Sequence, residues 1–243
     1  MKIANLHLYF LHVLSVIIFL FSCDKPEEIR PIYTENISVD TFENYSYLAL
    51  GDSYTTGEGV ASNQSFPEQL KKSLENQLAA KIDVQTIATT GWRTDDLLRV
   101  VEIQSSNKKY DFVTLLIGVN NQYQGRPFSQ YEQEFPQLLE KAIQAVNNNL
   151  NRVFVISIPD YAYTPFGQNQ NTDEISNEID RYNTFAKNTA VSKNVRFVTI
   201  TDITRRGLDE PNLVAPDGLH PSGDAYEIFV SRIAPFIYSQ LKD

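Results

Sequence analysis

The sequence comprises 243 residues, of which 42% are hydrophobic and 21% are charged, a balance that describes one ordinary globular domain able to bury a full core. The formal net charge of -9 and the sequence pI near 4.9 argue against a nucleic-acid partner, because such a partner requires a basic face that neutralises phosphates. An anionic membrane surface would repel the chain for the same reason.

The first 22 residues differ in composition from the rest of the chain. Lys2 is followed by a mostly apolar run, residues 6–21, that contains no acidic residue. This run is shorter than the roughly 20 residues that cross a bilayer, so it is typical of the core of a signal peptide. We therefore predict a signal peptide over residues 1–22. The alternative is an uncleaved helix that ends at Cys23.

The apolar run ends in Leu20-Phe21-Ser22-Cys23, which resembles the lipobox of bacterial lipoproteins, although Phe21 is atypical at its position. The resemblance implies cleavage before Cys23, lipid on that cysteine, and a protein anchored in the bacterial cell envelope, at the outer membrane or the cell surface. Cys23 is the only cysteine, so no disulfide can form within the chain. We interpret residues 23–44 as a solvated acidic tether and residues 45–243 as the folded domain.

After the tether, short apolar or β-branched runs alternate with longer helical patterns. The predicted strands cover residues 45–50, 82–88, 112–117, 152–158 and 195–200. The predicted helices cover residues 65–80, 94–104, 129–148, 173–191 and 221–241. Such alternation is typical of an α/β fold whose parallel sheet is covered by helices on both faces. We therefore predict a three-layer α/β/α domain with a five-stranded parallel sheet.

Two prolines bear on the helix boundaries. Pro136 lies within the predicted helix 129–148, and we expect it to break the helix or to begin a second segment, because proline removes a hydrogen bond from a helix interior. Pro221 is expected in the first turn of the last helix, where its missing N–H is tolerated.

Loops that follow the strands of a parallel sheet gather at one edge, where α/β folds bind their ligands. The chemically distinctive residues of these loops are, in chain order, Asp52, Ser53, Gly91, Asn120, Asp217 and His220. The long, polar and aromatic stretch 159–172 is expected to form a lid or a substrate rim. Once a signal peptide is removed, His220 is the only histidine of the chain.

Ester hydrolysis by serine requires a nucleophile, a base, an acid that orients the base, and donors for the developing oxyanion. We expect Ser53 to attack the ester, His220 to take its proton, and Asp217 to hold the imidazole. The backbone N–H groups of Ser53 and Gly91, with the side-chain amide of Asn120, are expected to form the oxyanion hole.

Four short motifs contain these residues: Gly51-Asp52-Ser53-Tyr54, Thr89-Thr90-Gly91-Trp92, Gly118-Val119-Asn120-Asn121 and Asp217-Gly218-Leu219-His220-Pro221. They resemble the four motifs of the SGNH/GDSL hydrolase family and occur in the family's order. The resemblance extends from Tyr45 to the carboxyl terminus and implies a flavodoxin-like serine esterase that uses no metal and no organic cofactor. Two positions depart from the pattern: Tyr54 stands where leucine is commoner, and Asn121 replaces the usual aspartate. The first bears on the acyl pocket, and the second on the support of the third motif's loop.

Other interpretations of these residues stay open. Ser53 alone could be a capping residue, Asp217 and His220 could be an ordinary loop pair, and Asp52 is expected to support the turn. A metal site is disfavoured because one histidine and one lipidated cysteine leave only carboxylates as ligands. The glycines near Ser53 lack the Gly-Lys-Ser/Thr pattern of a phosphate-binding loop. Acidic residues are numerous, but no spacing singles out a pair for glycoside hydrolysis.

Aromatic residues near the predicted nucleophile bear on the substrate. We predict a substrate rim of Tyr54, Trp92, Tyr123 and Tyr161, which would line an acyl pocket or stack on sugar rings, although each could simply cover the edge of the sheet. The expected activity is removal of a small acyl group, acetyl, from a glycan or a similar substrate of the envelope. The alternatives are a lysophospholipase or thioesterase acting on longer acyl chains, and a catalytically silent surface lipoprotein that binds glycan.

Overall fold

The computed structural model describes residues 43–104 and 108–242 of the chain. The predicted signal peptide, the tether up to residue 42 and the lipidation of Cys23 lie outside the described residues. Within the described ranges, no helix is both long enough and apolar enough to cross a bilayer.

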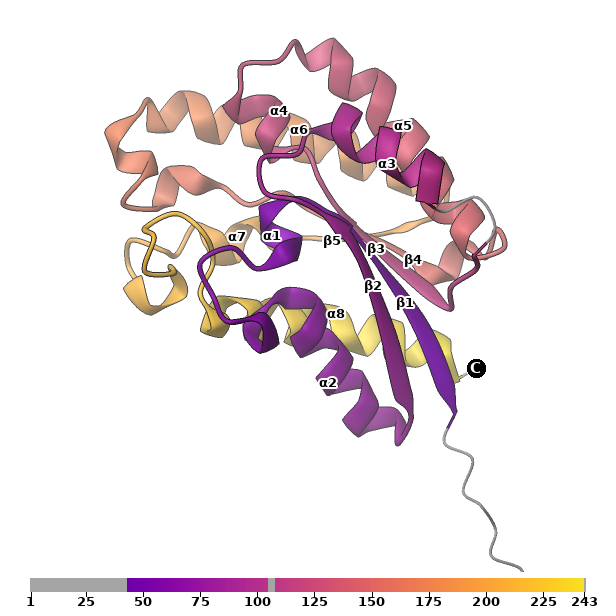
Figure 1. Ribbon diagram of the computed structural model, residues 1–243. Helices are drawn as coiled ribbons and strands as arrows, with labels where there is room; N and C mark the ends of the chain where they lie inside the picture. The colour runs from indigo at the N-terminus through magenta and orange to yellow at the C-terminus, as the bar shows by residue number, and fades with distance from the viewer. Residues whose placement is uncertain (1–42, 105–107, 243) are drawn as a thin grey trace, which may run out of the picture. The chain divides into compact units, whose positions relative to one another are not determined.

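Five parallel strands form a single sheet in the order β2-β1-β3-β4-β5 (Figure 1). They are β1 (Asn44–Gly51), β2 (Lys81–Ala88), β3 (Phe112–Leu116), β4 (Val153–Ile156) and β5 (Arg196–Val198). Every residue of β3 and β4, two of the three inner strands, is buried, as expected where helices cover both faces of a parallel sheet. The predicted fold class is therefore confirmed.

β4 and β5 are shorter than predicted. Beyond their ends, the side chain of Ser157 accepts hydrogen bonds from backbone N–H groups that would otherwise bond to a neighbouring strand. Ser157 Oγ accepts hydrogen bonds from the backbone N–H groups of Ile200 at 2.8 Å and Thr201 at 3.1 Å. β4 and β5 therefore separate from regular pairing just where the functional loops begin.

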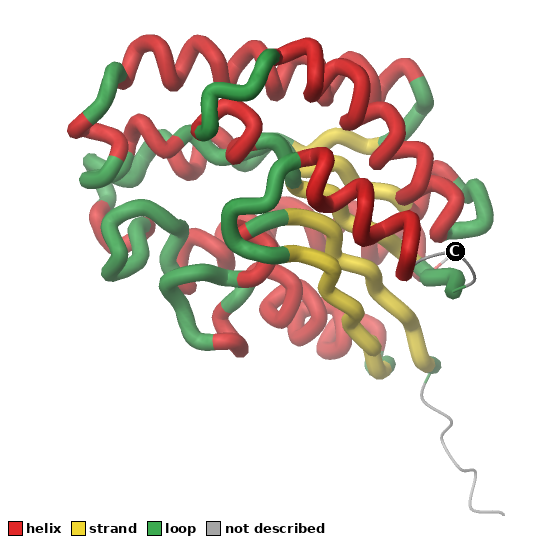
Figure 2. Tube along the Cα trace, turned by 45° about the horizontal axis from the view of Figure 1, so that its top comes forward, coloured by secondary structure: helices red, strands yellow, loops and turns green. Residues whose placement is uncertain are grey.

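Helices cover both faces of the sheet. The five long ones are α2 (Phe66–Leu78), α3 (Thr94–Gln104), α5 (Phe128–Ala145), α6 (Thr172–Ser192) and α8 (Gly223–Lys242). α2 packs against α8 on one face, and α3, α5 and α6 lie on the other (Figures 1 and 2). Three short helices were not predicted, because four or five residues show no helical periodicity: α1 (Ser53–Thr56), α4 (Val119–Tyr123) and α7 (Thr201–Thr204).

The expected break at Pro136 is wrong. α5 runs without interruption from Phe128 to Ala145 with Pro136 inside it. The flanking side chains of Phe135, Leu138 and Leu139 are buried in the core. Their burial offsets the roughly 3 kcal/mol that a proline costs in a helix interior.

The expected place of Pro221 is also wrong. α8 begins at Gly223, two residues later, and Pro221 instead forms an isolated antiparallel bridge with Val214. Ser222 is the capping residue, since its Oγ accepts a hydrogen bond from the N–H of Ala225 at 3.2 Å. A serine side chain satisfies a free amide of the first turn, which proline cannot do, and this sets the start of the helix.

Candidate active site

A cavity of about 250 Å³ lies at the carboxyl edge of the sheet. Each of the five chain segments that follow the strands contributes residues to its wall. One residue from each segment, in chain order, is Ser53, Gly91, Asn120, Tyr161 and His220. Among the described residues, no lysine, arginine, aspartate or glutamate lines this cavity. The space beside Ser53 is therefore open and carries no formal charge other than that which His220 can acquire.

Ser53 is the first residue of α1 and is separated from the end of β1 by Asp52 alone. The preceding Asp52 caps this helix: its Oδ1 accepts the N–H of Tyr54 at 3.1 Å, and its carbonyl accepts the N–H groups of Thr55 and Thr56 at 3.0 Å. Ser53 is 4% exposed and lines the cavity. Its own backbone N–H donates to no protein acceptor in the described ranges.

His220 is held by Asp217, three residues earlier in the chain. Its Nδ1 lies 2.7 Å from Asp217 Oδ2, and Asp217 Oδ1 accepts the N–H groups of Leu219 and His220 at 2.9 and 3.0 Å. Burial opposes ionisation of Asp217, but these hydrogen bonds lower the pKa of its carboxyl overall. A charged carboxylate can only accept, so Nδ1 carries the proton and Nε2 of the neutral imidazole is left as the acceptor.

The ring of Tyr54 packs on the base. Its centroid lies 5.1 Å from that of the His220 imidazole at an interplanar angle of 54°. Tyr54 is buried, and burial raises the pKa of its hydroxyl well above the usual value, so the ring stays neutral. The tyrosine that replaces the commoner leucine therefore forms one wall of the imidazole site.

Ser53 Oγ and His220 share the cavity but are not hydrogen-bonded to each other. Within the part of the chain that the structure describes, Ser53 Oγ has no hydrogen-bond partner. Catalytic hydrogen bonds in structures without substrate are often long and tighten only when substrate binds.

The three residues predicted to donate to the oxyanion, Ser53, Gly91 and Asn120, all line the cavity. Gly91 has a φ of +81°, a conformation that suits glycine, and its N–H has no protein acceptor among the described residues. Asn120 donates one N–H of its side-chain amide to the carbonyl of Trp92 at 3.1 Å, and its side chain also interacts with Asp52. With the N–H of Ser53, these groups could stabilise a tetrahedral oxyanion.

The structure thus brings together all five residues for which the sequence predicts a catalytic part: Ser53, Gly91, Asn120, Asp217 and His220. Of the predicted rim, Tyr54, Tyr123 and Tyr161 line the cavity, and Trp92 does not. Trp92 contributes its carbonyl as the acceptor for Asn120 instead.

Gln124 is a site residue that the sequence analysis missed. Its Nε2 donates to the carbonyl of Gly91 at 2.9 Å, and its Oε1 accepts from Arg93 Nη1 at 2.7 Å. It also lines the cavity. No local pattern marks a glutamine whose partners lie on another loop, so only its place after Tyr123, just beyond the third motif, could have suggested it.

Asp52 is fully buried behind the nucleophile. Its Oδ2 is one of the few buried side-chain oxygens with no hydrogen-bond partner in the described residues. Burial raises the pKa of Asp52 to about 7, against the lowering effects of the Tyr54 N–H and of the Asn120 side chain. This agrees with a supporting part in the turn. Among the residues described, no three histidine, cysteine or acidic side chains are placed to bind a metal ion.

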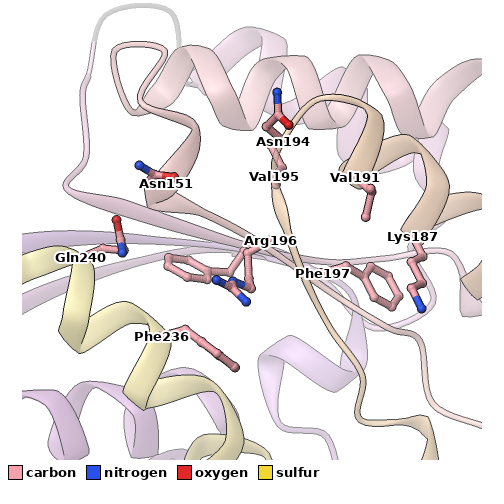
Figure 3. Close-up of a pocket in the computed structure, with 10 residues that line it drawn as sticks. Asn151, Lys187, Val191, Asn194, Val195, Arg196, Phe197, Phe236 and Gln240 are labelled. Atoms are coloured by element: carbon pink, nitrogen blue, oxygen red, sulfur yellow. The ribbon is translucent and has the colours of Figure 1, made fainter.

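Another cavity, of about 370 Å³, lies at the edge strand β5 (Figure 3). The Arg196 guanidinium lies 4.5 Å from the centre of the Phe236 ring there. Among the described residues, its lining contains no serine, cysteine, histidine or acidic residue. It therefore lacks the serine, histidine and carboxylate that ester hydrolysis by serine requires.

Most of the chain matches a known protein family. Residues 49–228 match the model of the GDSL-like lipase/acylhydrolase family. No protein with a curated description matches the sequence.

Several solved structures are similar in fold. An acetylxylan esterase from Geobacillus stearothermophilus is 19% identical, with a TM-score of 0.62 over 81% of this chain and 95% of that chain. A lipase/acylhydrolase from Enterococcus faecalis is 21% identical, with a TM-score of 0.61 over 81% and 96%. A psychrotrophic esterase from Pseudoalteromonas sp. is 16% identical, with a TM-score of 0.57 over 82% and 97%. At these identities the likeness establishes the fold.

Proposed function

Because this chain belongs to the GDSL-like lipase/acylhydrolase family it is an ester hydrolase, and we propose that it cleaves small carboxylic esters through an acyl-enzyme on Ser53. The observation that carries the proposal is the oriented base: His220 is fixed by Asp217 at 2.7 Å and lines the same cavity as Ser53. The free N–H groups of Ser53 and Gly91 support it further.

In the first half of the reaction, Ser53 Oγ attacks the ester carbon while its proton passes to His220 Nε2. The carbonyl oxygen becomes an oxyanion that accepts hydrogen bonds from the N–H groups of Ser53 and Gly91 and from the Asn120 amide. When the tetrahedral intermediate collapses, the bond to the alcohol oxygen breaks, and His220 returns the proton to the leaving alcohol. An acyl group remains on Ser53.

In the second half, water replaces the alcohol. His220 takes a proton from the water, the hydroxide attacks the acyl carbon, and the same donors hold the second oxyanion. Collapse breaks the bond to Ser53 Oγ, which recovers its proton from His220. Asp217 stays ionised throughout and stabilises the imidazolium that forms in each half.

The proposed substrate is an ester that joins a small acyl group, acetyl, to a neutral alcohol such as a glycan. The uncharged lining of the cavity supports a neutral alcohol. The nearby Arg93 is already engaged, with Nη2 at 2.9 Å from Asp95 and 3.4 Å from Asp96. An acetylxylan esterase among the structures of similar fold adds support.

The aromatic wall favours a second candidate, a lysophospholipase or thioesterase acting on longer acyl chains. Tyr123 packs edge-on against Tyr161 with centroids 5.8 Å apart, and Phe166 lies 6.0 Å from Tyr123. These three aromatic rings line the cavity and could cover an acyl chain as well as a sugar ring.

We further propose that lipid on Cys23 anchors the enzyme in the bacterial cell envelope, at the outer membrane or the cell surface. The support is the composition of residues 1–22 and the Leu20-Phe21-Ser22-Cys23 motif.

The deciding experiment measures hydrolysis of p-nitrophenyl esters from acetate to palmitate by a protein that starts after Cys23, with Ser53→Ala as the control. Activity that depends on Ser53 and is confined to short chains is the expected result. A maximum at long chains would favour the second candidate. Equal activity in Ser53→Ala, or none at any length from the folded protein, would contradict the proposal.

A further inference from the structure

Asn121 follows the proposed oxyanion residue Asn120 and is completely buried. It stands where the resemblance to the SGNH/GDSL family leads one to expect an aspartate. Its Oδ1 accepts the backbone N–H of Thr94 at 3.0 Å, and its Nδ2 donates to Thr94 Oγ1 at 2.7 Å. Both the oxygen and the nitrogen of the Asn121 amide therefore bind the same residue, Thr94, which is the first residue of α3.

The direction of these hydrogen bonds follows from the chemistry of the partners. The backbone N–H of Thr94 can only donate, so it must face the oxygen of the amide, and the NH₂ group then faces Thr94 Oγ1. The Thr94 hydroxyl has a single hydrogen, which it donates to Glu134 Oε2 at 2.5 Å. The chain of donors thus runs from Asn121 through Thr94 to Glu134.

An aspartate at position 121 does not fit this chain. Its second oxygen would compete with Glu134 for the one hydrogen of the Thr94 hydroxyl, and a second negative charge would be buried beside the first. Among the described residues, Glu134 has no cation within ion-pair distance, and its other donor is the Gln130 amide at 3.1 and 3.2 Å. The amide at 121 and the carboxylate on α5 are therefore complementary.

This network ends at the loop that carries the oxyanion donor. Residues 91–94 are tied to α4 and to the residue that follows it by hydrogen bonds at three points: Gln124 holds the carbonyl of Gly91, Asn120 holds that of Trp92, and Asn121 holds Thr94. Of the three, only Asn121 binds both the backbone and the side chain of its partner, Thr94. Its partner Thr94 is also hydrogen-bonded to Glu134 on α5.

We propose that Asn121 is a positioning residue which, with Glu134 as its partner, fixes residues 91–94 so that the Gly91 N–H points at the developing oxyanion. The inference rests on the proposed function. It also accounts for the asparagine at position 121. The carboxylate of this network is supplied by Glu134 on α5, and Thr94 links it to the amide at position 121 on α4.

The test is a double-mutant cycle read in kcat and KM on p-nitrophenyl acetate. Asn121→Asp is expected to lower kcat about tenfold or more with little change in KM, because a displaced oxyanion donor weakens binding of the transition state and not of the ester. Adding Glu134→Gln removes the competing charge and returns an amide to the network, so the double variant should recover to within a few-fold of the wild type. Glu132→Gln is the matched control, since it makes the same change at an exposed position of α5 and should give no recovery.

The outcomes separate this inference from the proposed function. An active wild-type enzyme in which Asn121→Asp leaves kcat unchanged, or in which Glu132→Gln rescues as well as Glu134→Gln, would overturn the inference alone. A wild-type protein without Ser53-dependent activity would overturn the proposed function and, with it, this link to catalysis. If Asn121→Asp does not fold by itself, Asn121→Ala removes the same hydrogen bonds without adding charge and should show the same fall in kcat.

Discussion

Gly59 makes room for the carboxylate of Asp217. A β-carbon at position 59 would lie 2.8 Å from Asp217 Oδ2, the oxygen that faces His220 Nδ1 at 2.7 Å. It would also lie 3.0 Å from the β-carbon of Ala215, so two residues of the same loop would have to shift. The loop after α1 and the loop before α8 are thus in close contact where Gly59 faces Asp217, the residue that orients His220.

We therefore expect Gly59→Ala to lower kcat/KM on p-nitrophenyl acetate about tenfold or more, because Asp217 must move away from His220. Gly59 has a φ of +81°, so the substitution also strains the backbone. Gly125→Ala is the matched control: it has a φ of +63° and no atom within 4 Å of its would-be β-carbon. If both variants lose the same activity, backbone strain accounts for the loss and the carboxylate does not.

Asp217→Asn is expected to lower kcat by roughly 10²- to 10⁴-fold while leaving the thermal midpoint nearly unchanged. An asparagine amide in place of the carboxylate can present its NH₂ to Nδ1, which leaves the proton on Nε2, where it blocks transfer from Ser53. Asp209→Asn, at an exposed position of the same loop region, should behave like the wild type. Retained activity in Asp217→Asn would remove Asp217 from its proposed part.

Asp52→Asn tests the buried carboxyl through the pH dependence of stability. Burial raises the pKa of Asp52 from 3.8 to about 7, so between these pH values the unfolded chain releases a proton that the folded chain keeps. The free energy of unfolding of the wild type must therefore fall as pH rises from 4 to 7, by up to about 4 kcal/mol from this group. Asparagine keeps the cap on Tyr54 N–H and has no such dependence.

Thermal midpoints of both proteins from pH 4 to pH 8 give the measurement. The midpoint of Asp52→Asn minus that of the wild type is expected to increase up to pH 7 and then to level off. Asp83→Asn, at an exposed position of β2, provides the control and should show no such trend. A difference that stays constant over this range would mean that Asp52 is ionised in the folded protein.

Cys23→Ala tests the anchor. The full-length variant expressed in a bacterial host is expected to leave the membrane fraction, because the acyl chains that Cys23 would carry are then absent. Ser53→Ala is the control that should stay with the membrane. Retention of Cys23→Ala after a carbonate wash would point to an uncleaved helix over residues 6–21 in place of a lipid anchor.

The sequence by itself determined where the catalytic groups stand relative to the strands. Ser53, Gly91 and Asn120 each follow a short apolar run, and parallel strands bring their carboxyl ends to one edge, so local pattern and general topology suffice to gather them. The hydrogen bond between Asp217 and His220 is equally local, since three residues separate the partners.

Only the tertiary structure decided the contacts that support these groups. The fit of Gly59 to Asp217, the chain from Asn121 through Thr94 to Glu134, and the uninterrupted course of α5 through Pro136 depend on which helix faces which loop. Such contacts join segments distant in the chain, and their donors, acceptors and volumes are matched only after the helices pack. From the sequence alone, Asn121 is only a departure from the family pattern. Its part becomes visible once the structure shows its contacts with Thr94.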